Sequence, residues 1–136
     1  MNISKEKIGI IAKKHKLDFV ILHGSQVSGA VKGPETDVDI AIYRNGGIKA
    51  KEYLNIYSEF MHIFNGEELD LKTLHQVNPL FRFYAVRNSQ LLYGDKTEFN
   101  EFKAYAYRDM VDSHSLIKLE DYLTTKYQKE LRSKHD

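Results

Sequence analysis

The chain of 136 residues is the size of one domain and has no cysteine, which excludes a disulfide framework, a thiolate nucleophile and a cysteine-based zinc site. Its 20 basic and 19 acidic residues leave a net charge of +1, too small an excess to favour extended nucleic acid as the main partner. No apolar run has the length that a signal peptide or a membrane span needs, so we expect a cytoplasmic protein.

Along the chain, apolar residues alternate between helical and strand-like spacing, without an internal repeat or a linker rich in Pro, Gly or Ser. Ser4 is placed to cap the first helix, and Gly24 ends the first strand. In chain order we expect a helix at 3–16, strands at 18–23 and 37–43, a helix at 49–64, a strand at 68–74, a helix at 79–87 and a short apolar piece at 89–95 that ends in a turn.

Residues 97–131 carry apolar side chains that are mostly three, four or seven apart, which predicts one or two amphipathic helices. We expect a break near Ser113–Ser115, and we expect the apolar stripe to belong to the core, with a surface for a partner helix as the second interpretation. The alternation of elements predicts an α/β or α+β domain with a small sheet flanked by helices and a C-terminal helical tail.

Asp37 and Asp39 stand at the head of an apolar strand, close behind a glycine-studded turn. Side chains two apart in a strand share a face, so both carboxylates point the same way while Val38 and Ile40 face the core. Neighbouring carboxylates repel unless one is protonated or a cation lies between them. Such an oxygen-rich site suits Mg2+, which takes its other ligands from water and a substrate's phosphates.

Gly24 and Ser25 end the preceding strand and let a phosphate approach the backbone N–H groups and the hydroxyl. Together with the aspartates they predict a metal-bound triphosphate, the arrangement for phosphoryl or nucleotidyl transfer with two metal ions roughly 4 Å apart. Asp70 alternates with apolar neighbours and is the candidate third carboxylate, as a ligand of the second metal or as the base; Glu68 is the reserve choice. We expect His23, which directly precedes Gly24, to be structural.

Gly24-Ser25, Gly29, Asp37-Val38-Asp39-Ile40 and a later strand with Asp70 resemble the DNA polymerase β-like nucleotidyltransferase superfamily. Within it the chain is similar to the minimal nucleotidyltransferases (MNT) over nearly its whole length. The resemblance implies a small mixed sheet, and we expect a single domain over 1–136 with a catalytic core at 1–95 and the helical tail at 96–136. Eleven residues separate Ser25 from Asp37, where the family pattern commonly has ten, which leaves the path of that loop open.

The resemblance also implies an activity. Many minimal nucleotidyltransferases are antitoxins that, with Mg2+, transfer AMP from ATP to a tyrosine of a partner HEPN ribonuclease toxin. By motif position, Gly24 and Ser25 would bind the nucleotide, while Asp37, Asp39 and Asp70 would be catalytic and bind the metal ions. Two alternatives stay open: transfer to a small-molecule hydroxyl such as that of an aminoglycoside, and a non-catalytic antitoxin that neutralises its partner by binding.

Overall fold

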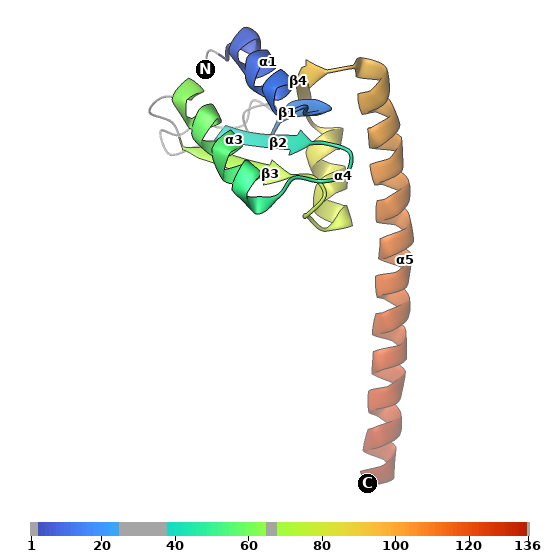
Figure 1. Cartoon of the computed structure of the whole chain (residues 1–136). Helices are drawn as coiled ribbons and strands as arrows, with labels where there is room; N and C mark the ends of the chain where they lie inside the picture. The colour runs from blue at the N-terminus through green and yellow to red at the C-terminus, as the bar shows by residue number, and fades with distance from the viewer. Residues whose placement is uncertain (1–2, 25–37, 65–67, 136) are drawn as a thin grey trace.

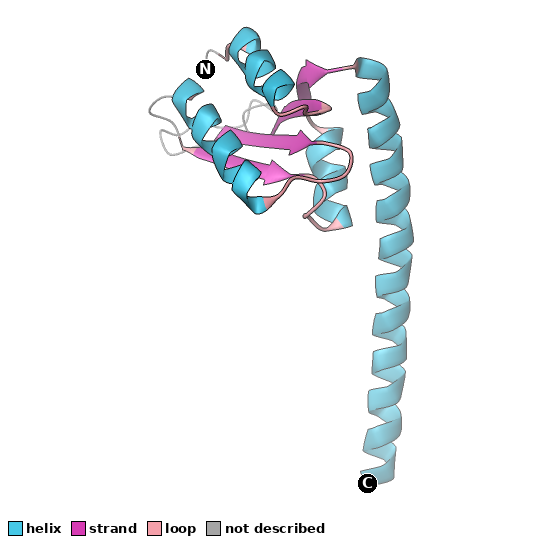
Figure 2. Ribbon diagram, in the orientation of Figure 1, coloured by secondary structure: helices cyan, strands magenta, loops and turns pink. Residues whose placement is uncertain are grey.

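The computed structural model describes residues 3–24, 38–64 and 68–135, without the side chains at positions 115, 117, 134 and 135. Ser25, Gly29 and Asp37 lie outside the described residues. The elements are α1 (Lys5–Lys14), β1 (Phe19–His23), β2 (Val38–Tyr43), α3 (Ala50–Ile63), β3 (Leu69–Thr73), α4 (Pro79–Arg87), β4 (Gln90–Gly94) and α5 (Lys96–His135), as Figures 1 and 2 show.

The four strands form one mixed sheet in the order β3-β2-β1-β4. Strand β1 pairs antiparallel with both β2 and β4, whereas β2 and β3 are parallel and are joined through the crossover helix α3. The apolar segment at 89–95, for which the sequence predicted neither helix nor strand, therefore contains the fourth strand, β4. The mixed sheet flanked by helices is confirmed as the fold class.

Helices cover both faces of the sheet, so the molecule has three layers (Figure 1). On one face, α1 and α3 bury Ile8, Ile56 and Phe60 against Val38 and other strand residues of the same face. The Ser4 side chain accepts a hydrogen bond from the Lys7 N–H and caps α1, as the sequence predicts. This face forms the larger core and holds β2 and β3 in register.

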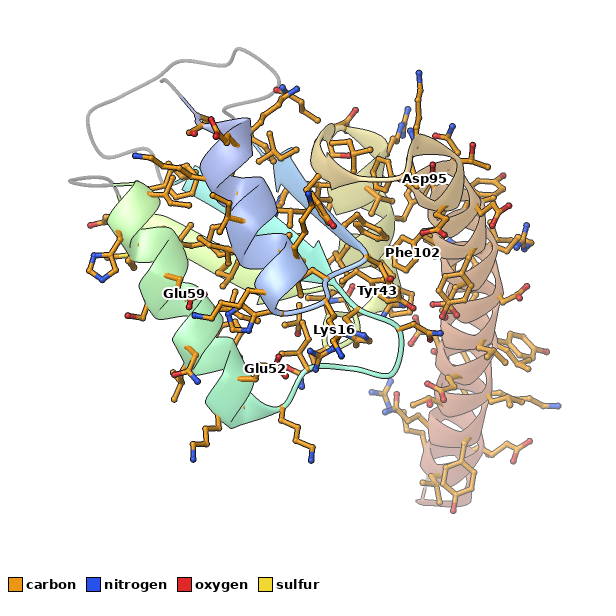
Figure 3. All side chains as sticks on the ribbon, turned by 45° about the horizontal axis from the view of Figure 1, so that its top comes forward. Lys16, Tyr43, Glu52, Glu59, Asp95 and Phe102 are labelled. Carbon is orange, nitrogen blue, oxygen red and sulfur yellow. The ribbon has the colours of Figure 1, made fainter. Side chains whose placement is uncertain are left out.

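On the opposite face, α4 and the first turns of α5 pack on β1 and β2. The Phe102 ring of α5 lies 4.5 Å from the Tyr43 ring of β2, and Figure 3 shows the two side chains together. The Asn78 side chain caps α4 by accepting from the Phe81 N–H, and Pro79 stands at the first helical position. These two residues define where α4 begins.

Helix α5 runs without interruption from Lys96 to His135 and extends well beyond the rest of the molecule (Figure 2). The expected break near Ser113–Ser115 is wrong, since serine is a weak but tolerated helix former and no glycine or proline stands there. The apolar stripe of the C-terminal tail, which we expected to belong to the core, is buried only in the first turns of α5. Phe99, Phe102 and Ala106 are buried, but the apolar residues from Leu116 onward whose side chains are described are exposed, because no other described element reaches them.

No helix among the described residues combines the length and the apolar character that crossing a bilayer requires.

Candidate active site

Three polar side chains form a row across the sheet at the edge where β1 ends and β2 and β3 begin. His23 is the register partner of Asp39, and Asp39 is the register partner of Asp70. Register partners on neighbouring strands lie about 5 Å apart and project to the same face. Parallel pairing of β2 and β3 therefore brings the two aspartates side by side, as their alternation with apolar neighbours predicts.

Gly24 closes this row at the end of β1. Its φ of +80° lies in the left-handed region, and a Cβ at this position would lie 3.1 Å from the Asp39 Cγ and would overlap Oδ2. Only a glycine lets the backbone pass the Asp39 carboxylate at this distance. The turn therefore brings the backbone directly against the Asp39 carboxylate, which occupies the position that a side chain at residue 24 would need.

Lys72 lies two residues beyond Asp70 on the same face of β3. Its Nζ is 3.4 Å from Asp70 Oδ1 and 5.5 Å from the centroid of the Phe81 ring, which lies on α4. Both side chains of the ion pair are more than a third exposed, so solvent screens the attraction and the pair contributes little to stability. Lys72 therefore offsets part of the local negative charge without occupying the space beside Gly24.

His23 is the site residue whose surroundings the sequence did not reveal. The side chain is buried, the Phe81 ring meets it edge-on at 5.9 Å, and among the described residues its Nε2 has no hydrogen-bond partner. Burial lowers the pKa of His23, the charge of Lys72 lowers it further, and Asp70 opposes the shift. The imidazole is thus neutral at pH 7 and adds no positive charge beside the aspartates.

A cavity of about 600 Å³ opens beside Gly24, between the end of β1 and α4. Its wall combines aromatic rings, a guanidinium and an amide, and it has no carboxylate among the described residues. It is lined by His23, Gly24, Phe81, Tyr84, Ala85, Arg87, Asn88 and Ser89. A planar ring with hydrogen-bonding groups at its edge suits such a wall, because ring faces stack and the amide bonds in the plane.

The residues present fit a magnesium ion that carries a polyphosphate. Asp39 and Asp70 supply oxygen ligands from adjacent strands, and Mg2+ requires only one or two carboxylates beside water and phosphate oxygens. The glycine at position 24 lets the backbone approach the Asp39 carboxylate closely, since a Cβ there would overlap Oδ2. Within the described ranges no three His, Asp or Glu side chains form a metal cluster, and the third predicted carboxylate, Asp37, is outside those ranges.

The comparisons with known proteins concern the family and the fold. Residues 6–98, more than half of the chain, match the model of the polymerase beta nucleotidyltransferase family. No curated protein sequence matches the chain.

Solved structures resemble it over almost the whole length. A chain of a toxin–antitoxin crystal structure with AMP-PNP has a TM-score of 0.65 at 16% identity, with 98% of this chain and 100% of that chain covered. A chain of the complex between the tri-AMPylated Shewanella oneidensis HEPN toxin and an MNT antitoxin has a TM-score of 0.60 at 16% identity, with 97% and 96% covered. A chain of the toxin–antitoxin pair MntA-HepT has a TM-score of 0.59 at 15% identity, with 97% of this chain and 97% of that chain covered. At these identities the likeness shows the fold, and together with the family match it establishes that the chain belongs to the polymerase beta nucleotidyltransferase family.

Proposed function

We propose that the protein is an antitoxin that transfers AMP from ATP to a tyrosine hydroxyl of a partner HEPN ribonuclease toxin and thereby neutralises it. The observation that carries the proposal is the pairing of Asp39 with Asp70 beside the Gly24 turn, on a chain of nucleotidyltransferase fold. The similar chain from the tri-AMPylated toxin complex supports AMP as the transferred group and a HEPN protein as the acceptor. In this proposal residues 1–95 are the catalytic core and 96–136 the helical tail of one domain.

Each site residue has a role in the proposal. Asp37 and Asp39 would hold Mg2+, and Asp70 would bind the second ion or act as the base; the bound ions would offset the negative charge that develops on the phosphate oxygens. Gly24 lets the backbone lie against the Asp39 carboxylate. By motif position, the Ser25 hydroxyl would donate a hydrogen bond to the triphosphate.

The reaction exchanges one oxygen–phosphorus bond for another. The acceptor oxygen bonds to the α-phosphorus, the bond to the leaving pyrophosphate breaks, and the hydroxyl proton passes to a carboxylate of the site, for which Asp70 is the candidate. The neutral His23 contributes no positive charge, so it does not compete with the metal ions for the carboxylates.

We place the adenosine of ATP in the cavity beside Gly24. Phe81 and Tyr84 offer ring faces for stacking, and an asparagine amide such as that of Asn88 can bond two edge atoms of adenine. The cavity has room for a nucleoside and shares Gly24 with the carboxylate site, so the base and the reacting phosphate would occupy adjacent spaces.

The test is to incubate the protein with ATP, Mg2+ and the HEPN protein encoded beside it, and to measure the intact mass of that partner. We expect a mass increase of one or more AMP units, with the modification on a tyrosine. Asp39→Asn should abolish the increase, whereas Glu101→Gln, which removes an exposed carboxylate on α5, should leave it unchanged. An unmodified partner with the wild-type protein would refute the proposal.

Two outcomes would point to the alternatives. If Asp39→Asn still neutralises the partner in cells while no adduct forms, the protein acts by binding alone. If no HEPN partner is modified but expression confers resistance to an aminoglycoside, the acceptor is a small-molecule hydroxyl.

A further inference from the structure

The distal part of α5 presents an apolar stripe that no other described element covers. Leu116, Leu119, Leu123, Tyr127 and Leu131 follow one another at intervals of three or four residues, so they lie along one side of the helix. Their exposed fractions range from 40% for Leu131 to 63% for Tyr127. A helix that displays such a stripe over about four turns is usually packed against another helix.

The surface of the stripe also has the shape that accepts a facing helix. A shallow depression of about 520 Å³ lies among Leu123, Thr124, Lys126, Tyr127 and Glu130. Four of these residues occupy positions i, i+3, i+4 and i+7, the four-residue hole that receives one side chain of a partner helix in knobs-into-holes packing. The depression thus favours a helical occupant.

The charges along α5 select a second copy of the same helix in the opposite direction. Residues 112–121 contain three acidic side chains and one basic side chain, whereas residues 124–133 contain three basic and one acidic. Antiparallel pairing centred between Leu123 and Thr124 brings the acidic half of each helix against the basic half of the other, and parallel pairing would bring like charges together. Leu116 of each copy then lies opposite Leu131 of the other.

The projection of α5 from the domain permits this pairing. Asp109 of α5 forms an ion pair with Arg82 of α4, at 3.0 Å. Leu123 is 14 residues farther along the helix, about 21 Å at the rise of an α-helix. Antiparallel pairing thus places the two globular parts about 40 Å apart at opposite ends, which leaves room for both (Figure 1).

We propose that the protein forms a homodimer through antiparallel pairing of residues 116–131 of two copies of α5. This pairing is a two-fold interface in which the same surface of each copy contacts the other. It goes beyond the proposed activity and does not depend on it, because every residue involved lies outside the candidate active site.

The first test is the molar mass of the full-length wild-type protein by light scattering across a range of concentrations. We expect twice the mass of the chain at high concentration, and a mass of one chain for the double variant Leu119→Asp with Leu123→Asp. Leu54→Asp is the matched control, because Leu54 is an exposed apolar residue on α3; it should leave the dimer intact. A wild-type protein that remains monomeric at all concentrations would overturn the proposal. The same holds if the stripe is covered only by a different protein.

The second test fixes the direction of pairing and uses the absence of native cysteine. Leu116→Cys and Leu131→Cys proteins are mixed and oxidised, and the disulfide-linked products are separated by mass. Antiparallel pairing predicts mostly the mixed product that joins position 116 to position 131. Products that join each position only to itself would contradict antiparallel pairing.

Discussion

Replacing Gly24 with alanine tests the geometry of the candidate active site through one methyl group. An alanine at φ +80° is strained by about 1–2 kcal/mol because its Cβ approaches the following carbonyl. The new Cβ also overlaps Asp39 Oδ2, so the carboxylate must rotate away, at a further cost of about 1 kcal/mol for a displaced rotamer. We therefore expect Gly24→Ala to lower the free energy of unfolding by about 2–3 kcal/mol.

Gly46→Ala provides the matched control. Gly46 has φ +95°, and a Cβ there meets nothing within 4 Å, so this variant carries the backbone strain without the collision. It should lower the free energy of unfolding by only about 1–2 kcal/mol. The difference between the two variants isolates the contact with Asp39.

The functional effect of Gly24→Ala should be larger than its effect on stability. Misplacement of a catalytic group by about 1 Å can lower a reaction rate about 100-fold, so we expect transfer to fall by about that factor in Gly24→Ala and to stay near wild type in Gly46→Ala. Urea denaturation measures stability, and the rate of mass increase of the acceptor measures transfer. Wild-type transfer by Gly24→Ala would refute the assignment of Asp39 to the reacting centre.

Three further changes have defined outcomes. Arg82→Met removes a buried guanidinium that donates hydrogen bonds to the carbonyl oxygens of Leu74, His75 and Val77. We expect urea denaturation to show a free energy of unfolding lower by about 3 kcal/mol, and a decrease below about 1 kcal/mol would contradict the importance of these hydrogen bonds. Because the folded-state pKa of His23 lies below its unfolded value of 6.5, the contribution of His23 to stability is present above pH 6.5 and is lost as the pH falls through the folded-state pKa. The variant His23→Gln should therefore show a smaller decline of the urea midpoint as the pH falls. A pH profile identical to that of the wild type would refute this role of His23. Asn88→Leu should weaken ATP binding about 10-fold and reduce the preference for ATP over GTP, and unchanged calorimetric affinities for both nucleotides would exclude the amide from base recognition.

The sequence was sufficient for most elements because their signals are local. Ser4 and the apolar spacing after it define α1, and the run that ends at Gly24 defines β1. The adjacency of Asp39 and Asp70 was also predictable, since a helix between two strands favours parallel pairing and alternation fixes which side chains share a face.

The features that the sequence analysis missed depend on contacts between distant segments. Gln90–Gly94 becomes a strand because β1 offers it an open edge, a partner about 70 residues away that local periodicity cannot identify. The burial of His23 depends on Phe81 of α4. The distal stripe of α5 has the spacing of a core helix, and only the arrangement of the described elements reveals that it is left exposed.

Calorimetric titration with the non-hydrolysable nucleotide AMP-PNP tests the central claim most directly, because binding is measured without an acceptor. With Mg2+ present, we predict that the wild-type protein binds the nucleotide, that chelation of the metal abolishes binding, and that Asp39→Asn and Asp70→Asn each weaken it at least 10-fold, by about 1.4 kcal/mol or more. Wild-type affinity in either variant, or equal affinity with and without Mg2+, would contradict a nucleotide site built on these two carboxylates.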